Sequence, residues 1–257
     1  MPFYKNNSLR SAGLLFFLFF AGLPMAFAQE SLIQRIQYAL PCIVEITAKN
    51  AVMFKIPGSA FIDPDTGQLI QLDSIRAAEY TREGSGVVID PAGVIVTNAH
   101  TVNNSARTEV RLIDGQQVPA QTLKVIAEQD LAFLKIEPPC PLSRVDIVDS
   151  GTVQLDSEVV TVGSSPFLQK TISGGRVIGY AKHGNFYENS APDLFEININ
   201  IYQGDSGGPL FNSKGQLIGL MVAKQGDQDR RCFAIPSDKI IRAYLDLIEE
   251  IKQKGSL

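Results

Sequence analysis

The sequence predicts an all-β fold made of two β units, and three observations support that prediction. Short apolar runs of strand length recur along the chain, separated by turn sequences rich in Gly, Pro, Asn and Asp. A proline cluster at residues 138–141 divides these runs into two groups. Hydrophobic residues make up 45% and charged residues 19% of the 257 residues, as in ordinary globular proteins. Many short strands with regular turns are typical of a β-sandwich or β-barrel.

The first 28 residues are predicted to be a secretory signal that is not part of the fold. A basic start precedes the apolar run 14–23, and Ala26-Phe27-Ala28 supplies small residues for cleavage. Cleavage would leave a mature chain of residues 29–257 in the periplasm or outside the cell. The alternative is an uncleaved membrane anchor over residues 11–28, which carry no charge. Membrane attachment is expected only in that case.

The first β unit is expected over about residues 40–138. A short helix over 31–40 precedes it, because apolar residues recur there at helical spacing until Pro41. Between about Lys49 and Gly86 the sequence fits neither pattern, and a loop of that length is usually functional or disordered. The strands expected in this unit are Val87–Ile89, Val94–Val96, Val110–Ile113 and Leu131–Leu134.

The second β unit is expected over about residues 142–236, followed by a helix over about 237–253. Ser237 is the predicted N-cap of that helix. Its charged side carries both signs, so we expect it to dock on the second β unit and not on an anionic membrane. Its predicted apolar face consists of Ile240, Ile241, Tyr244, Leu245, Ile248 and Ile251. The strands expected in this unit are Val159–Val162, Arg176–Gly179, Leu194–Ile201 and Leu217–Leu220.

Charge and cysteine content exclude several functions. A formal net charge of −4 gives no reason to expect nucleic acid as a partner. The chain has three cysteines, so export permits one disulfide with one thiol left over. Cys42 lies in an apolar run and is expected to pack as a small apolar side chain. No residues have metal-ligand spacing, and no metal or cofactor is expected.

One serine, one histidine and one aspartate carry the chemistry that the sequence suggests. Ser206 lies in Gly204-Asp205-Ser206-Gly207-Gly208, where the N–H groups of Gly204 and Ser206 could converge as an oxyanion hole. His100 follows the end of a predicted strand, and Asp130 begins another. Each alone has a simpler explanation as a turn, surface or cap residue, but together they supply nucleophile, base and orienting acid. The chain's other histidine, His183, is interpreted as a structural or surface residue.

Four segments in the same order resemble trypsin-like serine proteases of the HtrA (Deg) type: 84–89, 95–100, 130–136 and 204–210. The order of the catalytic residues is also that of the chymotrypsin-type triad. The resemblance implies one protease domain over residues 29–257, with two six-stranded antiparallel β-barrels of the chymotrypsin type and a C-terminal helix. It also implies a serine endopeptidase acting on protein or peptide substrates, with His100 as general base, Asp130 as orienting acid and Ser206 as nucleophile.

Several residues depart from the family pattern. HtrA proteases usually continue into peptide-binding PDZ domains, but this chain stops about twenty residues after Pro236, so no PDZ domain is expected. Asp205 stands where the family often has Asn, and it needs a partner, either backbone amides or a nearby Arg. Cleavage would expose Gln29, so we expect no zymogen activation through an apolar N-terminus. Residues 51–81 stand in the place of the family's long loop in the first barrel and, with the N-terminal segment, could support a homotrimer.

Substrate preference is predicted from the residues expected near the nucleophile. Asn200 stands where an enzyme that cleaves after Arg or Lys would carry Asp, and Val222 is the second residue assigned to this pocket. Without an acid, a buried positive charge would be costly, so a small or medium apolar side chain is expected before the scissile bond. The alternative function is a binding or chaperone module with a protease fold, held inactive by its loops.

Overall fold

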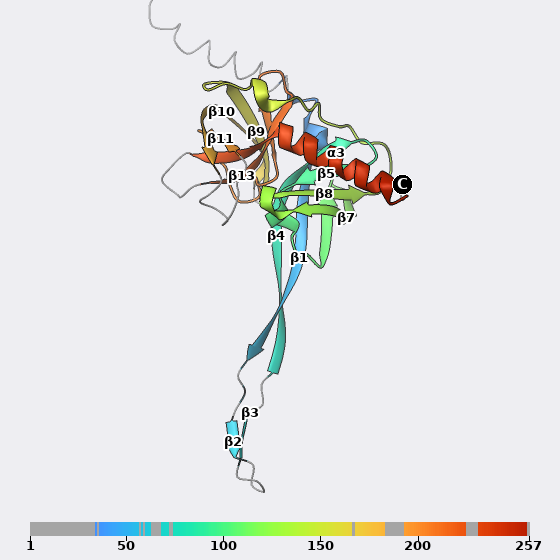
Figure 1. Ribbon diagram of the computed structural model, residues 1–257, viewed down its shortest axis with the longest axis vertical. Helices are drawn as coiled ribbons and strands as arrows, with labels where there is room; N and C mark the ends of the chain where they lie inside the picture. The colour runs from blue at the N-terminus through green and yellow to red at the C-terminus, as the bar shows by residue number, and fades with distance from the viewer. Residues whose placement is uncertain are drawn as a thin grey trace, which may run out of the picture.

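The computed structural model consists of two closed six-stranded antiparallel β-barrels followed by a C-terminal helix (Figure 1). The predicted fold class is therefore confirmed. The structure describes residues 34, 36–56, 58, 60–62, 68–71, 74–165, 168–182, 193–224 and 231–255. The predicted signal over residues 1–28 and His183 lie outside the described residues. Among the described helices, none combines the length and apolar character needed to cross a membrane.

The first barrel has the strand order β1-β4-β5-β8-β7-β6. The turn from β4 to β5 shows why the sequence folds this way, because Gly93 has φ 97° and donates its N–H to Asp90 O at 3.0 Å. A Cβ at position 93 would lie 2.4 Å from Ile136 O, so glycine is required there. The strands are β1 Ile43–Ile56, β4 Ser74–Asp90, β5 Val94–Thr97, β6 Arg107–Arg111, β7 Gln117–Ile126 and β8 Leu131–Ile136.

Strands β1 and β4 continue beyond the barrel as a long two-stranded arm (Figure 1). They pair without interruption from Ile43 opposite Val87 to Ile56 opposite Ser74. A second short hairpin, β2 Ala60–Ile62 with β3 Leu69–Gln71, lies at the arm's far end (Figure 1). The prediction of a loop between Lys49 and Gly86 is therefore wrong for the residues that pair in β1, β2, β3 and β4. The sequence could not reveal these strands by alternation, because neither face of the arm packs on the core.

The segment before β1 also differs from its prediction. Helix η1, a short 3-10 helix, spans Leu40–Cys42 and contains Pro41, so the proline does not end a helix there. Its fixed φ suits the first turn, where a missing N–H costs nothing. Of the residues expected in a helix over 31–40, 31–33 and 35 lie outside the described residues. Gln34 and Ile36 are helical, and residues 37–39 form a turn that leads into η1.

The second barrel has the strand order β10-β11-β14-β13-β12-β9. Its strand β11 is shorter than predicted and ends at Ile197 instead of Ile201. Beyond it, Asn198 still contacts β10, because its backbone N–H donates to Arg176 O at 3.2 Å and its side-chain Oδ1 accepts the Arg176 N–H at 2.6 Å. The strands are β9 Glu158–Ser165, β10 Leu168–Lys182, β11 Asp193–Ile197, β12 Pro209–Asn212, β13 Leu217–Lys224 and β14 Cys232–Pro236.

Helix α3, Ser237–Gln253, contacts both barrels, not only the second (Figure 1). Tyr244 stacks on Phe133 of the first barrel with ring centroids 5.9 Å apart. The prediction that Ser237 caps this helix is wrong: Pro236 is the N-cap, and the Ser237 hydroxyl donates to Val148 O in the inter-barrel segment. Leu245 is 55% exposed and does not belong to the buried face, which consists of Ile240, Ala243 and Leu247.

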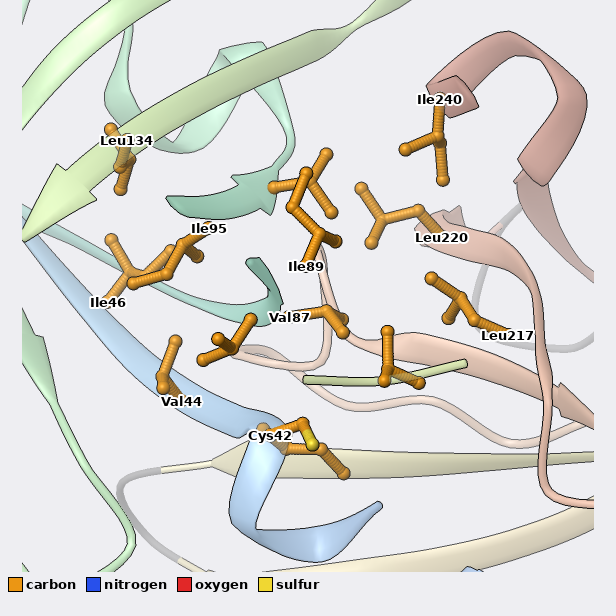
Figure 2. Close-up of a cluster of buried hydrophobic side chains, with 14 of the residues drawn as sticks. Cys42, Val44, Ile46, Val87, Ile89, Ile95, Leu134, Leu217, Leu220 and Ile240 are labelled. Carbon is orange, nitrogen blue, oxygen red and sulfur yellow. The ribbon is translucent and has the colours of Figure 1, made fainter. Parts of the chain in front are cut away.

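One apolar core runs through both barrels and α3 (Figure 2). Cys42 lies in this core with Val44 and Val87 from the first barrel and Leu217 from the second (Figure 2). The three cysteines are free thiols in the structure, so the disulfide that export would permit is not formed. Burial raises the pKa of both Cys42 and Cys232 to about 11, which keeps these thiols protonated at neutral pH.

Candidate active site

His100 and Asp130 lie together at the edge of the first barrel. His100 belongs to the short helix α2, Ala99–Val102, which follows β5 directly. Its Nδ1 lies 2.8 Å from Asp130 Oδ2, and its backbone N–H donates to Asp130 Oδ1 at 2.9 Å. The Asp130 side chain is 4% exposed, whereas that of His100 is 35% exposed. The carboxylate is thus shielded while the imidazole still reaches solvent, as a base that meets a substrate requires.

The backbone of Asp130 is held in an unusual conformation by the residues before His100. Asp130 has φ 52°, in the left-handed region, where it ends the 3-10 helix η2, Ala127–Gln129. Its carbonyl accepts the Ala99 N–H at 3.0 Å and the Asn98 side-chain Nδ2–H at 3.2 Å. Together with the His100 N–H, three donors from consecutive residues fix this aspartate. Sequence reasoning did not identify Asn98, although its place two residues before the histidine is a signal that could have been used.

Ser206 lies in the second barrel on residues 202–208, the loop directly before β12, which we call the nucleophile loop. Its Oγ donates to Val222 O at 2.8 Å, and within the described residues it makes no hydrogen bond with His100. Gly207, the next residue, has φ 81°, and a Cβ there would lie 2.1 Å from Ser85 O. Only glycine allows the nucleophile loop to approach the first barrel this closely.

The two predicted oxyanion donors have free N–H groups. Gly204 has φ 100°, a conformation that glycine adopts readily. Within the described part of the chain, neither the Gly204 N–H nor the Ser206 N–H donates to a protein acceptor, whereas the N–H groups of Asp205, Gly207 and Gly208 all do. The N–H of the serine and that of the glycine two residues before it are thus available to stabilise a developing negative oxygen.

Asp205 belongs to the nucleophile loop, and its buried side chain stabilises a turn in that loop. Its Oδ2 accepts the Tyr202 N–H at 2.7 Å, and its own N–H donates to Tyr202 O at 3.0 Å. Its Oδ1 has no hydrogen-bond partner among the described residues. A Cβ at Gly163 would lie 1.9 Å from this oxygen, so only glycine leaves room for the carboxylate. The partner that the sequence left open is therefore a backbone amide.

Substituting Asp205→Asn should make stability depend differently on pH. Burial raises the pKa of Asp205 above its ordinary value of 3.8, and the Tyr202 amide opposes this in part. A carboxyl whose folded-state pKa is raised stabilises the fold below its unfolded-state pKa, and this contribution is lost as pH rises through the folded-state pKa. The Asn variant keeps the bond to Tyr202 and cannot ionise. Its stability relative to wild type should therefore increase from pH 4 to pH 8 in urea unfolding. An equal difference at both values would contradict a raised pKa.

The two residues predicted for substrate preference differ in their surroundings. Asn200 is exposed in the segment between β11 and the nucleophile loop. Val222 on β13 is 5% exposed, and its carbonyl is the acceptor for Ser206 Oγ. In the part of the chain that the structure describes, no group of three His, Cys, Asp or Glu side chains is placed to hold a metal ion.

Comparison with known proteins gives a family match that includes His100, Asp130 and Ser206. The chain matches the family described as the trypsin-like peptidase domain over residues 84–220. It is 32% identical over 205 residues to serine protease HTRA4 of Mus musculus, which covers 77% of this chain and 42% of that protein. It is also 32% identical over 170 residues to the periplasmic serine endoprotease DegP of Salmonella typhimurium, covering 65% and 36%. The chain thus spans about two fifths of the length of these relatives.

Proposed function

Because the chain belongs to the family of trypsin-like peptidase domains and is similar to HtrA and DegP proteases, we propose that it is a serine endopeptidase. Its proposed substrates are exported or misfolded proteins. The observation that carries this proposal is the buried Asp130 carboxylate, 2.8 Å from the Nδ1 of a partly exposed His100. The proposed nucleophile is Ser206. Among the described residues, its own N–H and that of Gly204 have no protein acceptor, which leaves both available as oxyanion donors.

In the proposed reaction, Ser206 Oγ leaves the Val222 carbonyl, rotates about χ1 and donates its proton to His100 Nε2 while it attacks the scissile carbonyl carbon. Asp130 accepts the Nδ1–H bond, which fixes the tautomer and stabilises the imidazolium. The Gly204 and Ser206 N–H groups bind the negative oxygen of the tetrahedral intermediate.

The second half of the reaction uses the same groups. The imidazolium of His100 gives its proton to the leaving amine, and the C–N bond breaks to leave an ester on Ser206. A water molecule then loses a proton to His100 and attacks this ester. The proton returns to Ser206 Oγ, which releases the acid product and regenerates the enzyme.

The proposal also covers export and assembly. The similarity to a periplasmic DegP supports a role for residues 1–28 in export, to be checked by the N-terminus of the mature protein.

The arm formed by β1 and β4 is proposed as the element that contacts other copies in a homotrimer. Val52 is 47% and Met53 70% exposed on it, and such apolar side chains can be covered by another chain. The solution mass at micromolar concentration tests this, and a monomer would contradict it.

A second candidate function is a binding or chaperone module whose active site is held inactive. One observation favours it: the Ser206 hydroxyl donates to Val222 O and not to His100 among the described residues. If that bond persisted with substrate present, the serine would not be activated. Reaction with a fluorophosphonate separates the two functions, because only an activated serine reacts at an appreciable rate.

Digestion of unfolded casein tests the proposed function and its substrate preference together. We expect the purified wild-type protein to cut casein mainly after small or medium apolar residues, because Asn200 offers no negative charge to a lysine or arginine. The cut sites are mapped by mass spectrometry of the products. Cuts mainly after Arg or Lys would contradict the predicted pocket. No digestion at any temperature below unfolding would contradict the endopeptidase activity.

A further inference from the structure

We propose that Ser85 is a positioning residue that holds the nucleophile loop of the second barrel against the first. This inference rests on the proposed endopeptidase function, because it concerns the same reaction. Ser85 lies on β4 and is fully buried, with 0% of its surface exposed. Its hydroxyl belongs to neither the proposed triad nor the proposed oxyanion donors.

Ser85 contacts the nucleophile loop at two points. Its backbone N–H donates to Ser206 O at 2.7 Å, and its side-chain Oγ–H donates to Gly204 O at 2.7 Å. The two acceptors belong to the two residues whose N–H groups form the proposed oxyanion hole. One residue of the first barrel therefore binds the carbonyls of both Gly204 and Ser206, the residues that supply these donors.

Ser85 is in turn fixed by the strand that leads to the catalytic base. The hydroxyl of Thr97, on β5, donates to Ser85 O at 2.7 Å and is itself buried. Three residues after Thr97 the chain reaches His100. Hydrogen bonds from Thr97 to Ser85 and from Ser85 to the nucleophile loop thus connect that loop with the chain segment that leads to His100.

Strand β4, which carries Ser85, also binds the helix that carries His100. Arg82 on β4 donates through Nη1 to His100 O at 3.1 Å and to Asn103 O at 3.0 Å. These are carbonyls at the end of α2, which lack partners within the helix. Residues 82–85 of β4 therefore bind the helix that carries His100 through Arg82 and the nucleophile loop through Ser85. This segment sets the distance between the two groups that exchange the proton.

The peptide between Gly204 and Asp205 is held by two hydrogen bonds: Gly204 O accepts the Ser85 hydroxyl at 2.7 Å, and the Asp205 N–H donates to Tyr202 O at 3.0 Å. The Ser85 hydroxyl is the one that ties this peptide to the first barrel. Glycine at φ 100° has accessible conformations that other residues lack, and the bond to Gly204 O selects one of them. Without the Ser85 hydroxyl this peptide can turn about the Gly204 Cα, and the Gly204 N–H on the other side of that atom would shift relative to the oxyanion. A displacement of about 1 Å in an active site can reduce the rate about a hundredfold.

The test compares Ser85→Ala with Ser237→Ala, using a peptide substrate taken from the mapped casein cuts. Ser237 is a matched control, since it is also 0% exposed and its hydroxyl also donates to a single carbonyl, Val148 O, away from the active site. We expect Ser85→Ala to lower kcat about tenfold to a hundredfold with KM within about twofold, because the oxyanion contact is made only in the transition state. Ser85→Cys, whose thiol is a weaker donor, should fall between Ser85→Ala and wild type.

Hydrogen exchange of the nucleophile loop gives a second readout that does not need activity. Exchange of amides in the peptide spanning residues 202–209 should be faster in Ser85→Ala than in wild type or Ser237→Ala. Equal kcat in the two Ala variants, or equal exchange in this peptide, would overturn the positioning role. If wild type itself neither cleaves peptides nor reacts with a fluorophosphonate, the proposed function fails. The exchange measurement still decides whether Ser85 orders the loop.

Discussion

Ser206→Ala should abolish proteolysis, with kcat reduced about 10⁵- to 10⁶-fold. The substitution removes the hydroxyl that we propose forms the acyl-enzyme, so what remains is hydrolysis assisted by binding and the oxyanion donors. Its effect on folding should be small. The Ser206 side chain makes one hydrogen bond, to Val222 O, whose loss costs about 1 kcal/mol. Casein digestion and urea unfolding of the purified variant measure the two effects separately.

The control for this prediction is Ser237→Ala, which removes a buried hydroxyl at the start of α3, directly after β14. Prepared in the same way, it should digest casein like wild type. Digestion by Ser206→Ala at more than about a hundredth of the wild-type rate would show that another group performs the chemistry. Loss of digestion in both variants would point to a folding defect.

Asp130→Asn should reduce kcat about 10⁴-fold, as the same change does in the chymotrypsin-type triad. The Asn oxygen can still accept the His100 N–H, now bonded to Oδ1 at 2.9 Å, so the local backbone should be retained. Its amide group would then face His100 Nδ1 as a donor. This makes Nδ1 an acceptor and places the ring proton on Nε2, where the base must be free to take the serine proton.

Asp114→Asn is the matched control for this substitution. Asp114 lies in the turn between β6 and β7, where its Oδ1 accepts the Gln116 N–H at 3.0 Å, a contact that Asn also makes. Its kcat should equal that of wild type. A loss of less than about tenfold in Asp130→Asn, with the circular dichroism spectrum and unfolding curve of wild type, would exclude Asp130 as the orienting acid.

Much of the fold follows from local sequence pattern. Strands such as Val87–Ile89 and Leu131–Leu134 are buried on the core, so their apolar runs identify them directly. The arm formed by β1 and β4 could not be found this way. Its outer part has both faces exposed, as the 70% exposure of Met53 illustrates, and its pairing is set by the partner strand and not by a core.

The candidate site shows the same division between local and distant information. His100, Asp130 and Ser206 could be selected because each lies in a short motif and their order is informative. The groups that hold them could not, since Asn98 acts on Asp130, 32 residues away, and Ser85 acts on Gly204, 119 residues away. The partner of Asp205 is close in sequence, but a bond from the Tyr202 amide depends on a turn that no motif specifies.

Labelling with a fluorophosphonate, followed by intact-mass and peptide mass spectrometry, tests the central claim most directly. The claim is that Ser206 is activated by His100 and Asp130 as a nucleophile. It predicts one covalent adduct per chain in wild type, located on Ser206, with no adduct in Ser206→Ala and much slower labelling in Asp130→Asn. A wild-type protein that is folded but unlabelled, or an adduct on another residue, would contradict it.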